Sequence, residues 1–292
     1  RANQDRDYHI FEEYAYYLVS EARQKCANHI FKLGGNVYAF DSTTIDLCLS
    51  VFWWAKFRKK KGGIKVHTLY DVETQIPAFF HITDASVHDS KVMIEIPYEP
   101  SSYYIFDRGY NNFKILYKIH QIEAYFVVRA KKNLGYKSIQ WKRRLPKNVL
   151  SDASVLLTGF YPKQYYPEPL RLVKYWDEEQ EREFIFITNA MHISALQVAE
   201  LYKNRWQVEL FFKWLKQHLK IKRFWGTTEN AVRIQIYAAI CAYCLVAIIQ
   251  HDMQLNRSTY EVLQILSISL TDKTHLRDLF DKTKFQNDKE RF

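Results

Sequence analysis

Cysteine is scarce in this sequence, and no spacing among the cysteines predicts a disulfide framework. The four are Cys26, Cys48, Cys241 and Cys244, which lie too far apart for the dense pairing of a small secreted domain. Cys241 and Cys244 form a C-x-x-C pair inside an apolar run, for which zinc binding and redox chemistry are the functional alternatives. Because no second pair completes a zinc site, we expect buried core cysteines and a reducing, intracellular setting.

Apolar runs of membrane-spanning length are also missing. The run AAICAYCLVAII at residues 238–249 covers about a dozen residues, whereas a membrane helix needs about 20. We therefore expect a buried helix here and no membrane partner. The chain begins with Arg1 instead of Met, and we interpret it as a fragment whose N-terminal region is missing.

Acidic residues are outnumbered, with 32 Asp and Glu against 42 Lys and Arg and a formal net charge of +10. The excess is concentrated in runs at residues 56–65 and 131–148, and the second run holds seven basic residues, no acid and interleaved aromatics. Such a run can be solvated surface, but this mixture is typical of surfaces that follow a nucleic-acid backbone. We therefore expect a nucleic-acid partner, with DNA contacts from Lys142, Arg143 and Arg144.

The hydrophobic pattern predicts a mixed α/β sheet with flanking helices. Alternation of apolar and polar residues indicates strands, and apolar residues three and four apart indicate helices. After a first helix at 8–27, the expected order is strands at 37–47, 63–72 and 75–85, a helix at 86–96, a strand at 101–110, a helix at 111–122, a strand at 124–130, a β-rich insertion from 131 to about 189, and helices at 194–218, 231–250 and 260–267.

Two aspartates close apolar runs. Asp41 follows VYAF and Asp107 follows YYIF, and turn-forming residues come after both. A charged residue that ends a buried strand lies at the edge of the sheet, where side chains from neighbouring strands converge. For either aspartate alone, a capping or turn role is the simpler interpretation.

A third carboxylate lies in the segment YKNRWQVELFFKWLK, residues 202–216. At 100° per residue, Tyr202, Arg205, Glu209 and Lys216 share one face of a helix. An apolar stripe runs beside that face: Leu201, Val208, Phe212, Leu215 and Leu219. Glu209 is therefore expected at a buried helix edge. The alternative is an ordinary surface helix on which Glu209 pairs with Arg205 and Lys213, the charged residues four positions away on either side.

Three carboxylates brought together would repel one another and would require a cation. Oxygen ligands suit Mg²⁺ or Mn²⁺, which also bind phosphate oxygens. Two such ions would activate a water or a 3′-hydroxyl and stabilise the leaving oxygen in attack on a phosphodiester. This chemistry agrees with the nucleic-acid partner that the net charge predicts.

The spacing Y-x2-R-x3-E-x6-K after FDST and FDRGY resembles the DDE transposases of bacterial insertion sequences, specifically the insertion-sequence-four family with its Y-R-E-K signature. The resemblance implies a ribonuclease-H-like catalytic domain interrupted by a β-rich insertion. It also implies that Asp41, Asp107 and Glu209 are the catalytic residues and hold Mg²⁺ or Mn²⁺, as two ions. Tyr202, Arg205 and Lys216, as members of the signature, would contact DNA phosphates, and we expect the same of the neighbouring Lys213.

The same resemblance implies a division of the chain and a set of partners. The segments are 1–36 as the remnant of a longer N-terminal region, 37–130 and 191–250 as the catalytic domain, 131–190 as the insertion, and 251–292 as a C-terminal helical segment with a charged tail. Such enzymes cut double-stranded DNA at the inverted-repeat ends of their element and join those ends to target DNA, in a cut-and-paste reaction. They act as homodimers on DNA, in the bacterial cytoplasm with the nucleoid.

An aromatic in the insertion of these relatives holds a flipped base. Trp141 and Trp176 are the tryptophans in the corresponding region, and core packing is the simpler interpretation for each. Another segment, HITDASVHD, contains His81, Asp84, His88 and Asp89 at spacings that suit a metal. No cysteine or third histidine is nearby, so we expect turn and helix-capping roles instead of zinc. His67, on a predicted strand, is expected to be structural.

Two rival functions stay open. A ribonuclease-H-like nuclease or resolvase would cleave DNA without strand transfer. A truncated, non-catalytic copy would only bind DNA. The sequence contains no Walker motif, Rossmann fingerprint or G-x-S-x-G.

Overall fold

The computed structural model describes residues 2–27, 31–48, 50–58, 61–218, 224–269, 273 and 275–282. Several predicted features lie outside these residues: Leu219 of the apolar stripe, Lys59 and Lys60 of the first basic run, and the end of the tail from residue 283.

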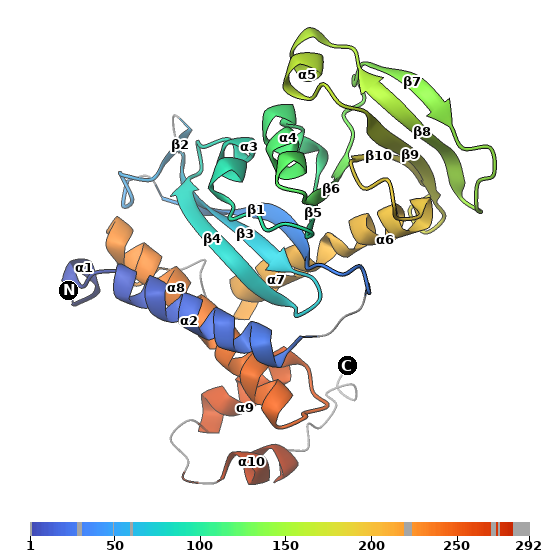
Figure 1. Ribbon diagram of the computed structural model, residues 1–292. Helices are drawn as coiled ribbons and strands as arrows, with labels where there is room; N and C mark the ends of the chain where they lie inside the picture. The colour runs from blue at the N-terminus through green and yellow to red at the C-terminus, as the bar shows by residue number, and fades with distance from the viewer. Residues whose placement is uncertain are drawn as a thin grey trace.

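A single mixed sheet organises the described part of the chain (Figure 1). Its strand order is β2-β3-β1-β5-β6-β10-β9-β8-β7, and β4 pairs with β3 beside this path. The strands are β1 (Val37–Leu47), β2 (Lys56–Arg58), β3 (Lys61–Asp71), β4 (Ile76–Asp84), β5 (Tyr103–Phe106), β6 (Tyr125–Arg129), β7 (Tyr136–Trp141), β8 (Val149–Leu157), β9 (Leu170–Asp177) and β10 (Arg182–Thr188). The predicted α/β class, a large mixed sheet flanked by helices, is confirmed.

Helices cover both faces of the sheet. They are α1 (Ala2–Asp5), α2 (His9–Lys25), α3 (Asp89–Val92), α4 (Phe113–Gln121), α5 (Phe160–Tyr165), α6 (Ala195–Asn204), α7 (Trp206–His218), α8 (Glu229–Asp252), α9 (Thr259–Ser269) and α10 (Leu276–Lys282), with 3-10 turns η1 (Met93–Glu95) and η2 (Arg108–Tyr110). In Figure 1, α2 and α8 pack against each other on the side of the sheet away from α3 and α4.

The central strands β1 and β5 are apolar because both of their faces are covered. Residues 37–40 of β1 and all of β5 are buried, as expected for strands in the middle of a sheet that has helices on each side. Val37 and Ala39 join the apolar cluster that includes α7 and α8. Tyr38 and Phe40 join the cluster on the opposite face, with α4. Side-chain alternation along β1 thus defines two distinct cores.

The predicted helix at 194–218 is wrong in one respect: it is two helices that meet at Arg205. Ser194 begins α6 with a capping box to Gln197. The N–H of Arg205 donates to Tyr202 O at 3.1 Å and the N–H of Val208 to Arg205 O at 3.2 Å. Hydrogen bonds between residues three apart tighten a helix locally, and here they separate α6 from α7.

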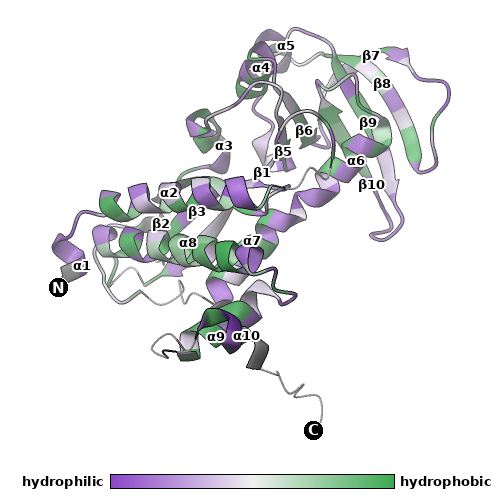
Figure 2. Cartoon of the chain, turned by 60° about the horizontal axis from the view of Figure 1, so that its bottom comes forward, coloured by the Kyte–Doolittle hydropathy of each residue, from purple (hydrophilic) through white to green (hydrophobic). Residues whose placement is uncertain are grey.

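Helix α8 is longer than the apolar run that predicts it. Among the described residues it is the one helix long and apolar enough to cross a membrane by length and composition, and 56% of its most apolar window is buried inside the protein. Figure 2 shows the hydrophobic stretches along it. Cys241 and Cys244 are free and buried in this helix, and burial raises the pKa of the two thiols to about 11 and about 12. The interpretation as core cysteines is therefore supported.

A buried ion pair fixes the outer strands to the start of α6. Arg171 of β9 donates to both carboxylate oxygens of Asp152 on β8, each at 2.8 Å. Its remaining terminal nitrogen donates to Ala190 O and Ile193 O at 3.3 and 2.5 Å. Ile193 directly precedes Ser194, the N-cap of α6, so the pair holds the start of this helix against the outer strands.

We predict that Asp152→Ala lowers the free energy of unfolding by about 3–5 kcal/mol, because it leaves the Arg171 guanidinium buried and without its counter-charge. Glu179→Ala, which removes an exposed pair with Lys203, is the matched control and should cost at most about 1 kcal/mol. Urea unfolding followed by tryptophan fluorescence measures both. Equal losses in the two variants would contradict this role for Asp152.

Candidate active site

Asp41 lies inside β1 and not at its end, so the strand-end prediction is wrong for this residue. The strand continues to Leu47, and Asp41 pairs with Thr68 of β3. The parallel pairing of β1 with β5, however, stops at Phe40 opposite Phe106. Asp41 is therefore the first residue of β1 that no longer has β5 beside it.

Asp107 does follow the end of its strand, as predicted. It comes directly after Phe106, the last residue of β5, so the two aspartates are next to each other in the register of the parallel pair. Asp107 precedes η2 but its side chain makes no capping hydrogen bond there. Its carboxylate instead accepts a hydrogen bond from the hydroxyl of Tyr202 at 2.9 Å.

Arg205 connects the first aspartate to Glu209. Its Nη1 lies 2.6 Å from Asp41 Oδ2, and its Nη2 lies 2.6 Å from Glu209 Oε1. Arg205, at the helix break, therefore links the start of α7 to β1. Together with the Tyr202–Asp107 bond, this arrangement brings all three predicted carboxylates to one region of the molecule, through two residues of the predicted helix face.

Burial raises the pKa of Asp41 to about 6; Arg205 and the N–H of Ser42 act against this rise, while Glu209 and Asp107 add to it. Burial also raises the pKa of Tyr202 to about 12, with a further contribution from Asp107. For Arg205, burial alone would lower the pKa, but the Asp41 carboxylate and its other neighbours raise it overall. The Arg205 guanidinium therefore stays charged, while the pKa of the neighbouring Asp41 carboxyl lies just below neutral pH.

A hollow of about 430 Å³ opens beside these acids. It is lined by Asp41, Ser42, Thr43, Glu209, Phe212, Lys213, Lys216 and Gln217. The amine of Lys216 donates to Thr44 O at 2.9 Å, which holds α7 to β1 one turn beyond Lys213. Two predicted phosphate-binding lysines therefore border the same hollow as two of the carboxylates.

A second hollow, of about 780 Å³, lies on the other side of the helix break. Its lining includes Tyr202, Arg205 and the exposed Trp206, and the aromatic side chains of Phe184 and Phe186 from β10. The sequence did not predict this hollow. Its β10 aromatics lie next to α6 because of the order of strands in the sheet, which the sequence pattern does not reveal.

The acids fit an oxygen-preferring cation in their chemistry. Asp41 and Glu209 already share one cationic group, and carboxylate oxygens are the ligands that Mg²⁺ and Mn²⁺ prefer. Among the described residues, however, no three histidine, cysteine or acidic side chains lie close enough together to hold a metal ion as they stand. Since Arg205 lies between Asp41 and Glu209, an ion bound by both would have to replace its guanidinium.

The basic residues of the insertion lie away from this region. β7 is six positions from β1 in the strand order, which at about 4.8 Å per strand is on the order of 30 Å. Lys142, Arg143 and Arg144 are exposed beyond the end of β7, and Lys142 reaches Asp152 at 3.3 Å. They form a separate basic surface at the sheet edge.

Core packing is wrong for both tryptophans of the insertion. Trp141 is 62% exposed on β7 and Trp176 is 39% exposed on β9. β7 is the last strand in the order and its residues are mostly exposed, so Trp141 has no second layer to pack into.

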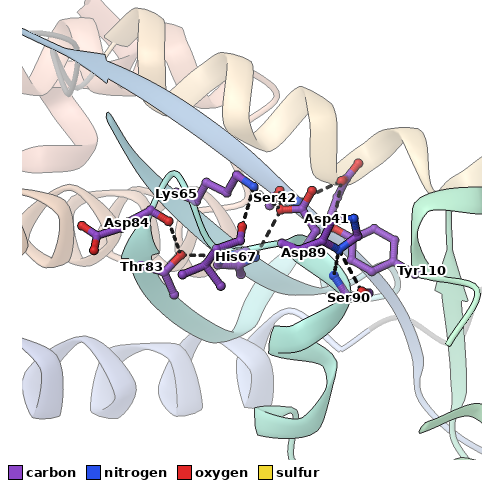
Figure 3. A network of polar contacts seen from close by, with 11 residues as sticks. Asp41, Ser42, Lys65, His67, Thr83, Asp84, Asp89, Ser90 and Tyr110 are labelled. Carbon is purple, nitrogen blue, oxygen red and sulfur yellow. Dashed lines mark hydrogen bonds and ion pairs between the residues drawn. The ribbon is translucent and has the colours of Figure 1, made fainter. Parts of the chain in front are cut away.

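The HITDASVHD segment contains a helix-capping residue, as predicted, and also makes a contact with β1 that the sequence did not predict. His88 caps α3, accepting a hydrogen bond from the N–H of Ser90 at 3.3 Å. Asp89 instead reaches back to β1, where it accepts a hydrogen bond from Ser42 at 2.8 Å. Tyr110 was missed too; its hydroxyl donates to Asp41 at 3.4 Å (Figure 3). Neither contact has a signal in the sequence, since both depend on long-range packing.

Comparison with known proteins gives a consistent picture. A family model described as a transposase DDE domain matches residues 32–245. A protein of Sinorhizobium fredii (strain NBRC 101917 / NGR234), named as a candidate transposase y4zB, is 37% identical over 246 residues, which are 82% of this chain and 67% of that protein.

Two further relatives are named as candidate transposases of insertion sequence elements. The protein for element IS5377 of Geobacillus stearothermophilus is 31% identical over 205 residues, which are 70% of this chain and 54% of that protein. The protein for IS4SA of Synechocystis sp. (strain ATCC 27184 / PCC 6803 / Kazusa) is 24% identical over 286 residues, which are 94% and 77% of the two chains.

We predict a pH dependence of stability that Asp41 causes. A carboxyl whose pKa rises from 3.8 to about 6 on folding stabilises the fold when protonated. Its contribution is fully present below about pH 3.8 and is lost as the pH rises through about 6, with a magnitude of about 3 kcal/mol. The free energy of unfolding, measured in EDTA between pH 4 and 7.5, should therefore fall more steeply in the parent protein than in Asp41→Asn. Parallel curves for the two proteins would contradict this.

Proposed function

This chain belongs to the family of transposase DDE domains, and on that basis we propose that it cleaves DNA at insertion-sequence ends and transfers the freed strands into target DNA. The observation that carries the proposal is the shared guanidinium: Asp41 and Glu209 meet at Arg205 beside Asp107, where two strands separate. Acids gathered in this way favour a cation and, with it, phosphodiester chemistry.

Asp41, Asp107 and Glu209 are proposed to hold two Mg²⁺ or Mn²⁺ ions. When bound, these ions would supply activation of a water or 3′-hydroxyl and stabilisation of the leaving oxygen. The protein contributes the placement of the acids, through the end of β5 and the contact of α7 with β1. It also contributes the hydroxyl of Tyr202, which holds one Asp107 oxygen in place.

Arg205 has two roles in this proposal. Between Asp41 and Glu209 it compensates the charge of the acids. Once replaced there, its guanidinium is free to bind a DNA phosphate through two parallel hydrogen bonds, for which its planar shape is suited. Lys213 and Lys216, on the border of the adjoining hollow, would attract the same backbone as point charges.

The finer assignment, to the insertion-sequence-four family, rests on the Y-R-E-K spacing of Tyr202, Arg205, Glu209 and Lys216. Residues 131–190 are proposed as the insertion within a catalytic domain formed by 37–130 and 191–250. Two copies acting on paired DNA ends would complete the assembly. The exposed Trp141 and Trp176 remain the candidates for stacking on a displaced base.

The direct test compares Asp41→Asn, Asp107→Asn and Glu209→Gln with the parent, using DNA that carries the element ends, target DNA and Mg²⁺. We predict that each variant loses cleavage by at least about 10³-fold while its melting temperature shows that it is folded. Glu200→Gln, an exposed acid on α6, is the control and should leave cleavage unchanged.

Variants that cut and join as well as the parent would overturn the assignment of the acids. Cleavage without joined products in the parent would indicate a nuclease or resolvase. DNA binding without any metal-dependent cleavage in the parent would indicate a non-catalytic copy.

We further predict that Arg143→Gln and Arg144→Gln each weaken DNA binding by a similar factor for all sequences. Each should also reduce the slope of log K against log salt concentration by about 1, because one phosphate contact is lost. Lys114→Gln, an exposed lysine on α4, is the control. Fluorescence anisotropy over a salt series measures the slopes, and unchanged slopes in both arginine variants would exclude the β7 edge from the DNA interface.

A further inference from the structure

We propose that Asp89 is a positioning residue for Asp41, acting through Ser42; this inference rests on the proposed function, in which Asp41 is a metal ligand. Asp89 is the first residue of α3, far from Asp41 in the sequence. Its carboxylate lies on the α3 side of β1, the strand that carries Asp41, within the polar network of Figure 3.

Ser42 links the two carboxylates. Its hydroxyl donates to Asp89 Oδ1 at 2.8 Å, and its backbone N–H donates to Asp41 Oδ1 at 2.8 Å. Consecutive residues of a strand point to opposite faces, so Ser42 presents its side chain to α3 while Asp41 faces α7. Ser42 thus connects Asp89 to the Asp41 carboxylate through Oδ1, which leaves Oδ2, the oxygen that contacts Arg205, for a metal.

This part of β1 needs such support because it has lost a neighbouring strand. β5 ends opposite Phe40, and from Asp41 onward β1 keeps only its pairing with β3. Two elements contact β1 where β5 is absent. Tyr110 of η2, which follows β5, donates to Asp41 at 3.4 Å, and Asp89 of α3, which follows β4, accepts from Ser42. Side-chain contacts therefore replace the missing strand at the catalytic residue.

Asp89 is itself held by β3. The amine of Lys65 lies 3.0 Å from Asp89 Oδ1 and donates to Val87 O at 2.7 Å. His67, fully buried, has Nδ1 3.9 Å from the same oxygen and Nε2 3.0 Å from Thr83 Oγ1. The Nδ1 atom has no hydrogen-bond partner in the described part of the chain.

The chemistry of this cluster argues for a positioning role over a purely structural one. The ion pair of Lys65 with the partly exposed Asp89 is a weak source of stability, because removing charges from water costs about as much as their attraction returns. Apolar residues would join α3 to the sheet as firmly. A hydrogen-bonded group behind a metal ligand, by contrast, typically affects metal affinity or activity by about 10–100-fold.

The test measures Mn²⁺ binding to the full chain without DNA, by the electron paramagnetic resonance of free Mn²⁺. Asp41→Asn first identifies the relevant site by abolishing its binding. We then expect Ser42→Ala and Asp89→Ala each to raise the dissociation constant of this site by about 10-fold, and Ser42→Thr, which keeps the hydroxyl, to restore the parent value. In the Asp89→Ala background, Ser42→Ala should have little further effect.

The control is Asp71→Ala, which removes a different acid, buried in β3, that pairs with a basic residue, Arg23, at 3.0 Å. It should destabilise the fold but leave the Mn²⁺ dissociation constant unchanged. Parent-like Mn²⁺ binding in Ser42→Ala and Asp89→Ala would overturn the positioning role while the proposed function stands. If Asp89→Ala does not fold, the Ser42→Ala and Ser42→Thr pair decides. An absence of Mn²⁺ binding at Asp41 in the parent would contradict the proposed function, and the positioning role with it.

Discussion

The repulsion between partly buried carboxylates is the constraint on which the rest of this structure depends. Asp41 and Glu209 come from elements far apart in the sequence and are held to one guanidinium, each at 2.6 Å. Without a cation between them, the contact of α7 with β1 would place two negative charges together in a partly buried site, at a cost of several kcal/mol. The break between α6 and α7 at Arg205 and the end of β5 beside Asp41 are the local features that make this contact possible.

Much of the site was predictable wherever the signal is local. Asp107 follows an apolar run and lies at the end of β5, and the helical spacing of Tyr202, Arg205 and Glu209 does direct all three toward the strands. Asp41 was expected at a strand end because an apolar run stops there, although the strand predicted at 37–47 already extended past it; β1 does continue, paired with β3. The separation of α6 from α7 was missed because Arg205 has helical backbone angles and no glycine or proline marks the break.

The contacts of Asp89 and Tyr110 were beyond prediction for a related reason. Both follow from which strand ends first: β5 stops at Phe106 while β1 runs on to Leu47. Where one strand ends before its neighbour, part of the longer strand has no partner on that side. The segments that follow the neighbouring strands then supply side chains there. The same sheet extends through β10, β9 and β8 to the basic edge at β7, so one continuous element relates the acids to a positively charged surface on the order of 30 Å away.

If Asp41 and Glu209 form a cation site that Arg205 fills in the absence of metal, the guanidinium and a metal ion exclude each other there. Anomalous X-ray scattering from crystals with and without Mn²⁺ shows which of the two is present. We expect a Mn²⁺ peak in contact with Asp41 and Glu209, with the Arg205 guanidinium displaced from between them, and the guanidinium back in place without the ion. Arg205 remaining between both carboxylates at saturating Mn²⁺, with no peak beside Asp41, would rule out this cation site.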